Sequence, residues 1–430
     1  MANDTHRAID AVWKIEAPRL IAGLARIVRD VGVAEDLAQD ALVAALEQWP
    51  KSGVPDKPGA WLMATAKHRA IDYFRRNVRV ERKHEELGRE LAIKEMAVPD
   101  FDAAFDPNNH DEVGDDLLRL IFVSCHPVLS PEARVALTLR LLGGMTTVEI
   151  ARAFLVPEPT IAQRIVRAKR TLTEKRVPFE VPHGAELAAR LASVLEVLYL
   201  IFNEGYSATA GDDWMRPALC EDALRFGRIL AELAPREPEV HGLVALMEIQ
   251  ASRSSARVTS TGEPILLLEQ NRARWNQLLI GRGLAALHRS EQVRGPDAAS
   301  PGPYALQAAI AACHARARAA EETDWTQIAA LYAQLARLTP SPVVELNRAV
   351  AIAMVKGPEH GLALIEDLLQ RGQLAHYHLA HSSHADLSRR LGRIPEARAS
   401  YEKALALLEP GNDQQEPERR FLARRLREMQ

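Results

Sequence analysis

The stretch Leu141–Leu172, LLGGMTTVEIARAFLVPEPTIAQRIVRAKRTL, predicts two short helices joined by a tight turn. Thr146 and Glu149 have the spacing of a capping box, which starts a helix just before an apolar-periodic segment. Pro157 should end this first helix, because proline disfavours the helical conformation in the residue before it. Pro159 stands where the first turn of a second helix tolerates a proline. The stretch is therefore predicted to be a helix-turn-helix.

The second helix of this pair should have one apolar and one polar face. Its apolar residues recur at i, i+4, i+7 and i+11 and should be buried: Ile161, Ile165, Ala168 and Leu172. Its other residues are of the types that read base edges and bind phosphates in a major groove. These candidate DNA-contacting residues are Thr160, Gln163, Arg164, Arg167, Lys169 and Arg170. The alternative is an ordinary helical hairpin with a solvated basic face, and we favour DNA binding.

Composition and charge set the wider frame. The chain has 430 residues, of which 47% are hydrophobic and 5% aromatic, which is typical of a helical protein with several domains. Its net charge of −3 means that any nucleic-acid binding depends on local basic clusters. The three cysteines are far apart and odd in number, so we expect neither a disulfide framework nor a cysteine metal site. The polar N-terminus and the absence of long apolar runs predict a cytoplasmic protein without membrane contact.

An amphipathic helix is predicted for residues 34–49, AEDLAQDALVAALEQW. The stripe expected to face the core consists of Leu42, Ala45, Leu46 and Trp49. A second face carries Asp36, Gln39 and Asp40. An acidic, amide-bearing face of this kind usually only meets solvent, so by itself it indicates no partner.

The next predicted helix, PGAWLMATAKHRAIDYFRRNVRVERK (residues 58–83), is basic and contains aromatic residues. Cations beside aromatic rings suit single-stranded or melted DNA, whose phosphates pair with Arg or Lys and whose bases stack on the rings. The candidate contacts are Trp61, Lys67, His68, Asp72, Tyr73, Arg75, Arg76 and Arg79. We also expect at least two of the three rings of Trp61, Tyr73 and Phe74 to pack in the core of a small bundle instead.

The chain is predicted to divide into four parts. Residues 1–84 form a first helical module, and residues 85–114 form an acidic connector without a helical stripe, marked by a Pro-Asn-Asn turn signal. Residues 115–180 form a second helical module that ends in the helix-turn-helix, and residues 181–430 form a helical extension. A connector of this length would let two nucleic-acid modules reach separate sites.

The order of these features resembles a bacterial extracytoplasmic-function (ECF) sigma factor over about the first 180 residues. AEDLAQDALVAAL is similar to the region-two helix that docks on the clamp helices of the RNA polymerase β′ subunit. WLMATAKHRAIDYFRR is similar to the part that melts and reads the −10 element. TTVEIARAFLVPEPTIAQRIVRAKRTL is similar to region four, which reads the −35 element beside the β flap. The resemblance implies that Asp36, Gln39 and Asp40 contact core polymerase.

The extension, residues 181–430, has no counterpart in a minimal sigma factor. Its sequence pattern predicts a helical repeat. Five of its residues follow the order and nearly the spacing of a tetratricopeptide (TPR) unit, whose period is about 34 residues: Ala385, Gly392, Ala397, Tyr401 and Ala404. Ala349 and Gly361 have the same separation as Ala385 and Ala397, which predicts another helix pair. Together with YLIFNEGYSA (199–208) and the Arg272–Arg274–Trp275 cluster, the extension resembles that of the ECF subgroup with a TPR-like C-terminal domain.

Two segments could suggest catalysis or metal binding, and we favour a structural role for both. His378, His381 and His384 are spaced i, i+3, i+6 beside His376, whereas metal ligation on a helix prefers i, i+4 with carboxylate or cysteine support. Asn203–Tyr206 should be a turn that ends a helix, with Gly205 near its C-cap. No nucleophile–base pair or phosphate loop accompanies them. We expect no enzymatic activity, no metal and no cofactor.

The sequence therefore predicts an all-α sigma factor with two small helical modules and a TPR-like repeat domain. Its expected partners are core RNA polymerase, promoter DNA and a regulatory protein on the extension. One alternative is a polymerase-independent helix-turn-helix regulator with a TPR-like sensor, and another is a TPR scaffold whose modules no longer bind DNA. We expect the extension to pack against a DNA-binding module and so to regulate promoter binding. The alternative is an extension that hangs free and recruits a partner.

Overall fold

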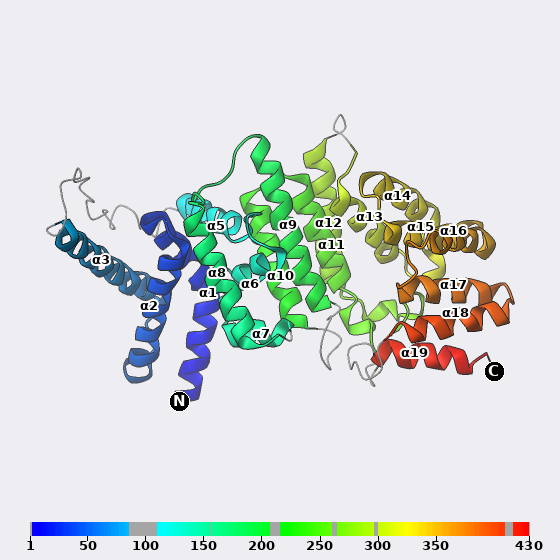
Figure 1. The fold of residues 1–430 in the computed structure, drawn as a ribbon, viewed down its shortest axis with the longest axis horizontal. Helices are drawn as coiled ribbons and strands as arrows, with labels where there is room; N and C mark the ends of the chain where they lie inside the picture. Colours follow the sequence, from blue (N-terminus) through cyan, green and yellow to red (C-terminus); the bar gives the residue numbers. More distant parts are fainter. Residues whose placement is uncertain are drawn as a thin grey trace. The chain divides into compact units, whose positions relative to one another are not determined.

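The computed structural model describes residues 2–85, 110–154, 156–206, 216–259, 265–295, 300–408 and 416–429. In these ranges the regular elements are helices, without a β-strand, which confirms the predicted all-α fold (Figure 1). They form two compact units, residues 1–200 and residues 201–430. Among the described helices, none is long and apolar enough to cross a membrane.

The first unit begins with three helices, α1 (Ala2–Val28), α2 (Val31–Ser52) and α3 (Pro58–Glu85). Asp30 caps α2, because its side chain accepts a hydrogen bond from the Val33 amide at 3.0 Å. Alanines line the buried side of α2 where it packs on α1: Ala34, Ala38, Ala41, Ala44 and Ala45. Trp49 lies at the end of this side, edge-on to Trp61 of α3 with 5.3 Å between ring centroids.

The second part of this unit holds the predicted helix-turn-helix. Its helices are α5 (His110–Ser124), α6 (Pro131–Leu141), α7 (Thr147–Phe154) and α8 (Glu158–Glu174). Residues 110–114 are helical, so the expectation of a connector without helix up to residue 114 was wrong at this end. The apolar residues from Leu118 onward anchor α5, and a helix nucleated there extends cheaply over the polar residues before it. The predicted turn at residues 107–109 lies outside the described residues.

Helix α9 (Ala185–Tyr206) begins inside the first unit, whose last residue is Leu200. Arg134 of α6 is buried, hydrogen-bonds to Ser193 and forms an ion pair of 2.9 Å with Glu196. Ser193 also donates to the carbonyl of Cys125 at 2.6 Å, and Arg190 donates to the carbonyl of Phe122 at 3.0 Å. The first compact unit thus includes the first turns of a helix that follows residue 180.

The expected turn at Asn203–Tyr206 is wrong, because α9 remains helical to Tyr206. Gly205 lies within the helix, where an added Cβ would be 2.6 Å from the backbone nitrogen of Cys220. Glycine is therefore required for a close approach to the next helix and not for a left-handed cap. Glu204 is buried beside it and forms an ion pair of 2.5 Å with Arg216.

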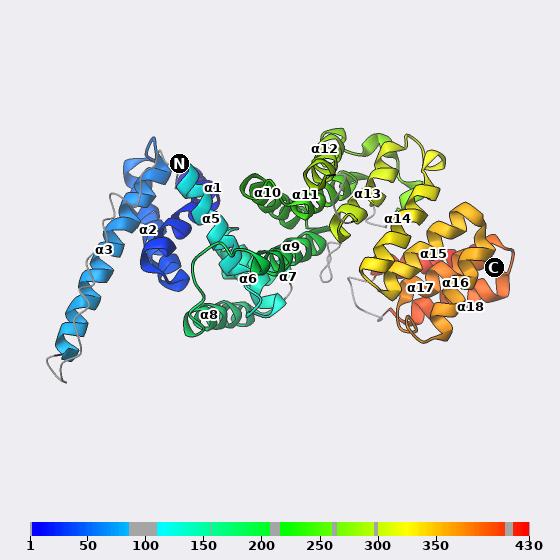
Figure 2. The same ribbon diagram turned by 90° about the horizontal axis from the view of Figure 1, so that it is seen from above.

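The second unit continues as a series of helices, most of which are connected by short loops (Figures 1 and 2). They are α10 (Pro217–Leu233), α11 (Pro238–Ala251), α12 (Gln277–Arg294), α13 (Pro303–Arg316), α14 (Trp325–Leu338), α15 (Pro342–Lys356), α16 (Pro358–Gln370), α17 (His378–Arg390), α18 (Ile394–Ala406) and α19 (Glu416–Arg427). From α13 onward each helix packs on the next, the pattern expected of stacked helical pairs. Most of them begin with proline in the first turn, where its missing amide costs no hydrogen bond.

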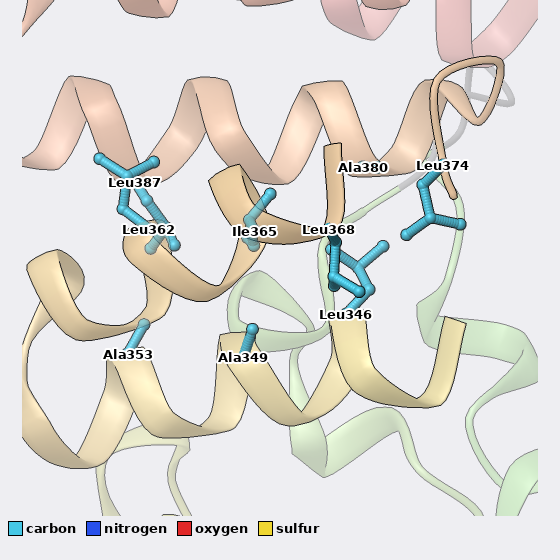
Figure 3. Close-up of a cluster of buried hydrophobic side chains, with 9 residues drawn as sticks. All are labelled: Leu346, Ala349, Ala353, Leu362, Ile365, Leu368, Leu374, Ala380 and Leu387. Atoms are coloured by element: carbon cyan, nitrogen blue, oxygen red, sulfur yellow. The ribbon is translucent and has the colours of Figure 1, made fainter. Parts of the chain in front are cut away.

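The small residues predicted at helix contacts lie where pairs of helices touch. Figure 3 shows the core between α15, α16 and α17, formed by Leu346, Ala349, Ala353, Leu362, Ile365, Leu368, Leu374, Ala380 and Leu387. At Gly361 an added Cβ would be 2.5 Å from the Cβ of Ala353 and 2.6 Å from the carbonyl oxygen of Ala349. In the next pair, Ala385, Ala397, Tyr401 and Ala404 are buried. Both predicted helix pairs are confirmed.

We expect Gly361→Ala to destabilise the second unit although alanine favours helices. The methyl group would push α15 and α16 apart, and overpacking costs typically about 1–3 kcal/mol, whereas the gain in helix propensity is at most about 1 kcal/mol. Gly281 of α12 is the control, because nothing lies within 4 Å of an added Cβ there. Gly281→Ala should stabilise by about 0.4–1 kcal/mol. Urea unfolding measures both; equal stabilisation by the two substitutions would contradict the close packing at Gly361.

The histidines of α17 make the contacts of packed helices. The ring of His381 bonds through Nε2 to the carbonyl of Ala375 at 3.0 Å, and Ser400 of α18 bonds to Nδ1 of His384 at 2.9 Å. Burial lowers the pKa of both rings from its ordinary value. His378 lies 2.9 Å from a carboxylate oxygen of Glu418 on α19. These contacts support the structural role that we favoured for this segment.

The Arg272–Arg274–Trp275 cluster also makes contacts that stabilise the fold. The Trp275 ring is buried, with the guanidinium of Arg272 at 5.1 Å and that of Arg253 at 5.9 Å from its centroid. Arg272 donates to the carbonyl oxygens of His314 and Ala317 at 2.6 and 2.7 Å. The cluster thereby fastens the irregular segment before α12 to the end of α13.

Candidate nucleic-acid interface

The capping box that opens α7 forms as predicted. The amide of Thr146 donates to Oε2 of Glu149 at 2.7 Å, and the amide of Glu149 donates to Oγ1 of Thr146 at 3.1 Å. Helix α7 ends at Phe154, and α8 begins at Glu158 directly after Pro157. The sequence thus folds locally into the predicted helix-turn-helix.

Helix α8 presents the polar face that a recognition helix needs. Its four predicted apolar residues are buried: Ile161, Ile165, Ala168 and Leu172. Gln163, Arg167 and Arg170 are exposed, whereas Thr160 and Arg164 are partly buried. Arg170 donates to the carboxylate of Glu174 at 2.6 Å, an exposed contact that a phosphate can displace at little cost.

Lys169 is placed differently from the rest of this face. Its side chain is only 18% exposed and forms ion pairs with Glu35 and, at 3.4 Å, with Asp36 of α2. In this arrangement its ammonium group neutralises carboxylates of the same chain. It can reach a DNA phosphate only after those contacts are broken.

The predicted single-strand contacts lie along α3. His68, Asp72 and Arg75 are exposed, while Trp61, Lys67 and Tyr73 are partly buried. Phe74 is buried and meets Tyr73 edge-on with 5.8 Å between ring centroids. One ring of the three is therefore in the core, where we had expected at least two. The side chains of Arg76 and Arg79 lie outside the described residues.

The acidic face of α2 is exposed and has an apolar end. The Asp36 side chain is 76% exposed, Asp40 is exposed and Gln39 is partly buried. Leu46 is 37% exposed, so its predicted place in the core was wrong. The alanine side of α2 packs on α1 instead, so Leu46 lies on the outer side of the helix, where Val43 is also exposed.

Glu35 is a site residue that the sequence did not suggest. It is only 2% exposed, with its Oε1 2.5 Å from Nε of Arg140 on α6 and its other oxygen in an ion pair with Lys169. Its partners are more than a hundred residues away in the sequence, so local periodicity carries no signal of these pairs. A glutamate on the buried side of an amphipathic helix was the only available clue.

Comparisons with protein families place known domains on these two groups of helices. Residues 13–80 match the model of sigma-70 region 2, and residues 119–172 match that of sigma-70 region 4. Residues 190–291 match DUF6596, a family of unknown function. The helix-turn-helix and the acidic and basic helices thus lie in the matched sigma-70 domains.

Two relatives are informative. The uncharacterised protein R00370 of Rhizobium meliloti is 41% identical over 401 residues, which cover 93% of this chain and 92% of the relative. The probable ECF RNA polymerase sigma factor SigI of Mycobacterium tuberculosis is 28% identical over 179 residues, 41% of this chain and 58% of that protein. No solved structure matches the chain.

Proposed function

We infer that this chain, which belongs to the family of the Rhizobium meliloti protein R00370 and carries sigma-70 regions 2 and 4, is a sigma factor that binds core RNA polymerase and directs promoter-specific initiation. A sigma-factor-like role in transcription follows from the two domains themselves. The polymerase would perform the chemistry. The protein's part is to bring the enzyme to chosen DNA.

One observation carries the proposal: the two matched domains place an exposed acidic face and an exposed basic face on separate helices of the same unit. The acidic face on α2 includes Asp36 and Asp40, and charge complementarity favours a partner with basic groups. The basic face on α8 includes Arg167 and Arg170, which suit the negative DNA backbone and the acceptor-rich edge of guanine. A factor that bridges polymerase and promoter needs both faces.

The helices are proposed to divide the DNA contacts between them. Gln163, Arg164 and Arg167 of α8, with Thr160, would read the upstream element in the major groove. Residues of α3 would hold the melted downstream element, with Trp61 and Tyr73 as stacking surfaces and Arg75 as a phosphate contact. The extension is proposed to regulate this activity, through contact with a sigma module or through a protein partner on its helical pairs.

We expect Arg167→Ala and Arg170→Ala to weaken DNA binding in different ways. Arg167 projects from the middle of the exposed face, and loss of a bidentate contact to guanine costs about 1–3 kcal/mol at one base position. Arg170 should contact phosphate, so its loss should weaken all sequences equally and make the salt dependence shallower. Binding to a panel of single-base promoter variants at several salt concentrations distinguishes these effects. Unaltered base preference in Arg167→Ala would reject its assignment.

Co-elution of the full chain with cognate core polymerase tests the proposed function. The proposal predicts a stable complex and promoter-specific DNA binding by that complex. A chain that binds promoter DNA specifically but never associates with polymerase would instead be a helix-turn-helix regulator that acts independently. A chain that binds neither would act as a scaffold.

A further inference from the structure

Three arginines gather beside two aromatic side chains in the second compact unit. We call them the guanidinium cluster, and its members are Arg253, Arg257 and Arg272. The guanidinium carbons of Arg253 and Arg272 lie 5.9 and 5.1 Å from the ring centroid of Trp275. That of Arg257 lies 3.7 Å from the ring centroid of Tyr206, whose hydroxyl accepts a hydrogen bond of 3.0 Å from Arg253. The cluster thus joins the end of α9 to the segment before α12, two stretches to which the proposed function gives no role.

Two members of the guanidinium cluster are bound by neutral groups. Arg253 donates to the Tyr206 hydroxyl and to the side-chain oxygen of Gln250. Arg272 donates to two backbone carbonyl oxygens and, at 3.0 Å, to the hydroxyl of Thr323. Among the described contacts, neither guanidinium forms an ion pair with a carboxylate. A guanidinium that is held by neutral acceptors keeps its full positive charge, so the cluster attracts anions.

The charges of the cluster act on one another. Burial lowers the pKa of Arg257 and of Arg272 from its ordinary value, and the nearby charge of Arg253 lowers both further. The two glutamates of the turn Ala320–Glu322 offset part of this effect at Arg272. Burial, Arg253 and Arg272 together lower the pKa of His314 to about 4, so this ring carries no charge near pH 7. The fold therefore holds three cations together at an electrostatic cost that a bound anion would reduce.

Buried polar atoms around the cluster have no hydrogen-bond partner among the described residues. They are the Nε atoms of Arg253 and Arg272, Nε1 of Trp275 and Nδ1 of His314. The Trp275 ring is only 3% exposed, so its N–H group is shut off from bulk solvent. Buried donors are almost always paired in folded proteins, and an unpaired donor is costly. Three such N–H groups in neighbouring side chains favour a bound group that is rich in acceptors.

We propose that the guanidinium cluster binds a small molecule that carries a phosphate group. Guanidinium groups recognise phosphate oxygens through paired N–H donors. Arg257 and Trp275 are buried and Arg253 and Arg272 are partly exposed, so the anion enters beside the latter two. This recessed position favours a small molecule over the surface of a protein or a DNA duplex. Tyr206, the cluster and Trp275 all lie within residues 190–291, so the proposal gives a binding function to the segment that matches DUF6596.

Calorimetric titration of the full chain with inorganic phosphate and with pyrophosphate tests this proposal. We expect saturable binding of both probes in a chloride buffer of constant ionic strength, which keeps nonspecific screening fixed. Both probes should also raise the unfolding temperature, because a ligand that binds only the folded state stabilises it by mass action. Absence of saturable binding of both probes would overturn the proposal.

Arg253→Met removes the charge that acts on the other members of the cluster and keeps an unbranched side chain. It should bind pyrophosphate at least about tenfold more weakly than the unmodified chain, because a hydrogen bond to a charged group is worth about a factor of ten or more. Arg253→Lys keeps the charge but loses the planar pair of donors, so its affinity should lie between the two. If circular dichroism shows that Arg253→Met does not fold, the weaker binding expected of Arg253→Lys provides the test.

Arg389→Met is the matched control. Arg389 is a partly buried arginine of the same unit, and its Nε also has no partner among the described residues, but Asp386 neutralises its guanidinium at 2.8 Å. Its loss should leave the affinity for both probes unchanged. Equal affinity of the Arg253 variants and this control for pyrophosphate would contradict the assigned site.

A single-stranded DNA oligonucleotide distinguishes the two sources of phosphate. We expect its affinity for the chain to be the same in Arg253→Met and in the control. If the oligonucleotide loses affinity in Arg253→Met while the two small probes do not, the cluster contacts nucleic acid and the small-molecule proposal is wrong. None of these titrations contains polymerase, so their outcome is independent of the proposed function.

Discussion

Reversing the charges of Asp36 and Asp40 is expected to weaken the association with core polymerase roughly 10- to 100-fold. Two arginines on this face would meet the basic groups of the partner, and like charges facing each other at an interface cost several kcal/mol. Asp36→Arg would also break the ion pair of Asp36 with Lys169 of α8, which by itself should make this face more accessible to a partner. A net loss of binding would therefore point directly to the acidic face. Co-elution or fluorescence titration with labelled polymerase measures the change.

The control for this prediction carries the same charge change elsewhere. Asp367 and Glu402 lie late in α16 and α18, each in a partly exposed ion pair with an arginine one turn away. Asp367→Arg/Glu402→Arg should leave polymerase binding unchanged. Exposed substitutions usually alter stability by less than about 0.5 kcal/mol, so both double variants should remain folded. If the α2 variant binds polymerase as well as the control does, the docking face is wrongly assigned.

Cutting the chain after Pro178 is expected to destabilise the helix-turn-helix module severely, whereas a cut after Tyr206 should leave it folded. The first turns of α9 bury Leu191, Val194 and Leu195 and supply the hydrogen-bond partners of Arg134. Each such apolar side chain contributes about 1.5–3 kcal/mol on burial, so three make up a large share of the stability of a domain, about 5–15 kcal/mol.

Thermal unfolding and hydrogen exchange of α5 and α6 should distinguish the two truncated chains. Equal protection of these helices in both would show that α9 does not support the module. The comparison also matters for any test of the extension as a regulator. Loss of activity in the chain that ends at Pro178 would reflect an unfolded helix-turn-helix module. The regulatory role of the extension should therefore be tested with the chain that ends at Tyr206.

Local chemistry made the helix-turn-helix predictable. The capping box of Thr146 and Glu149, the break at Pro157 and the apolar spacing of α8 all depend on residues close in sequence, and the structure confirms each of them. The small-residue spacing of Ala349 and Gly361 was informative for the same reason, since the two helices that it joins are adjacent in the chain. Spacings within one helix, or between two helices that follow each other in the chain, can be predicted from helix geometry alone.

The errors came from contacts between distant segments. Leu46 appeared to be a core residue because the α2 pattern is compatible with two apolar stripes, and only packing on α1 selects the alanine stripe. Gly205 appeared to be a cap because its close neighbour, Cys220, lies beyond a segment with no helical pattern. Glu35 was missed because both of its cations come from another domain. In each case the deciding residue is not a neighbour in sequence.

Run-off transcription with purified cognate core polymerase, with and without the full chain, tests the central claim most directly. Templates selected from genomic DNA by the complex of chain and polymerase would supply the promoters. The account predicts transcripts with defined start sites that depend on the chain and are reduced by Asp36→Arg/Asp40→Arg but not by the α16/α18 control. Transcription that is the same with and without the chain on every selected template would contradict its assignment as a sigma factor.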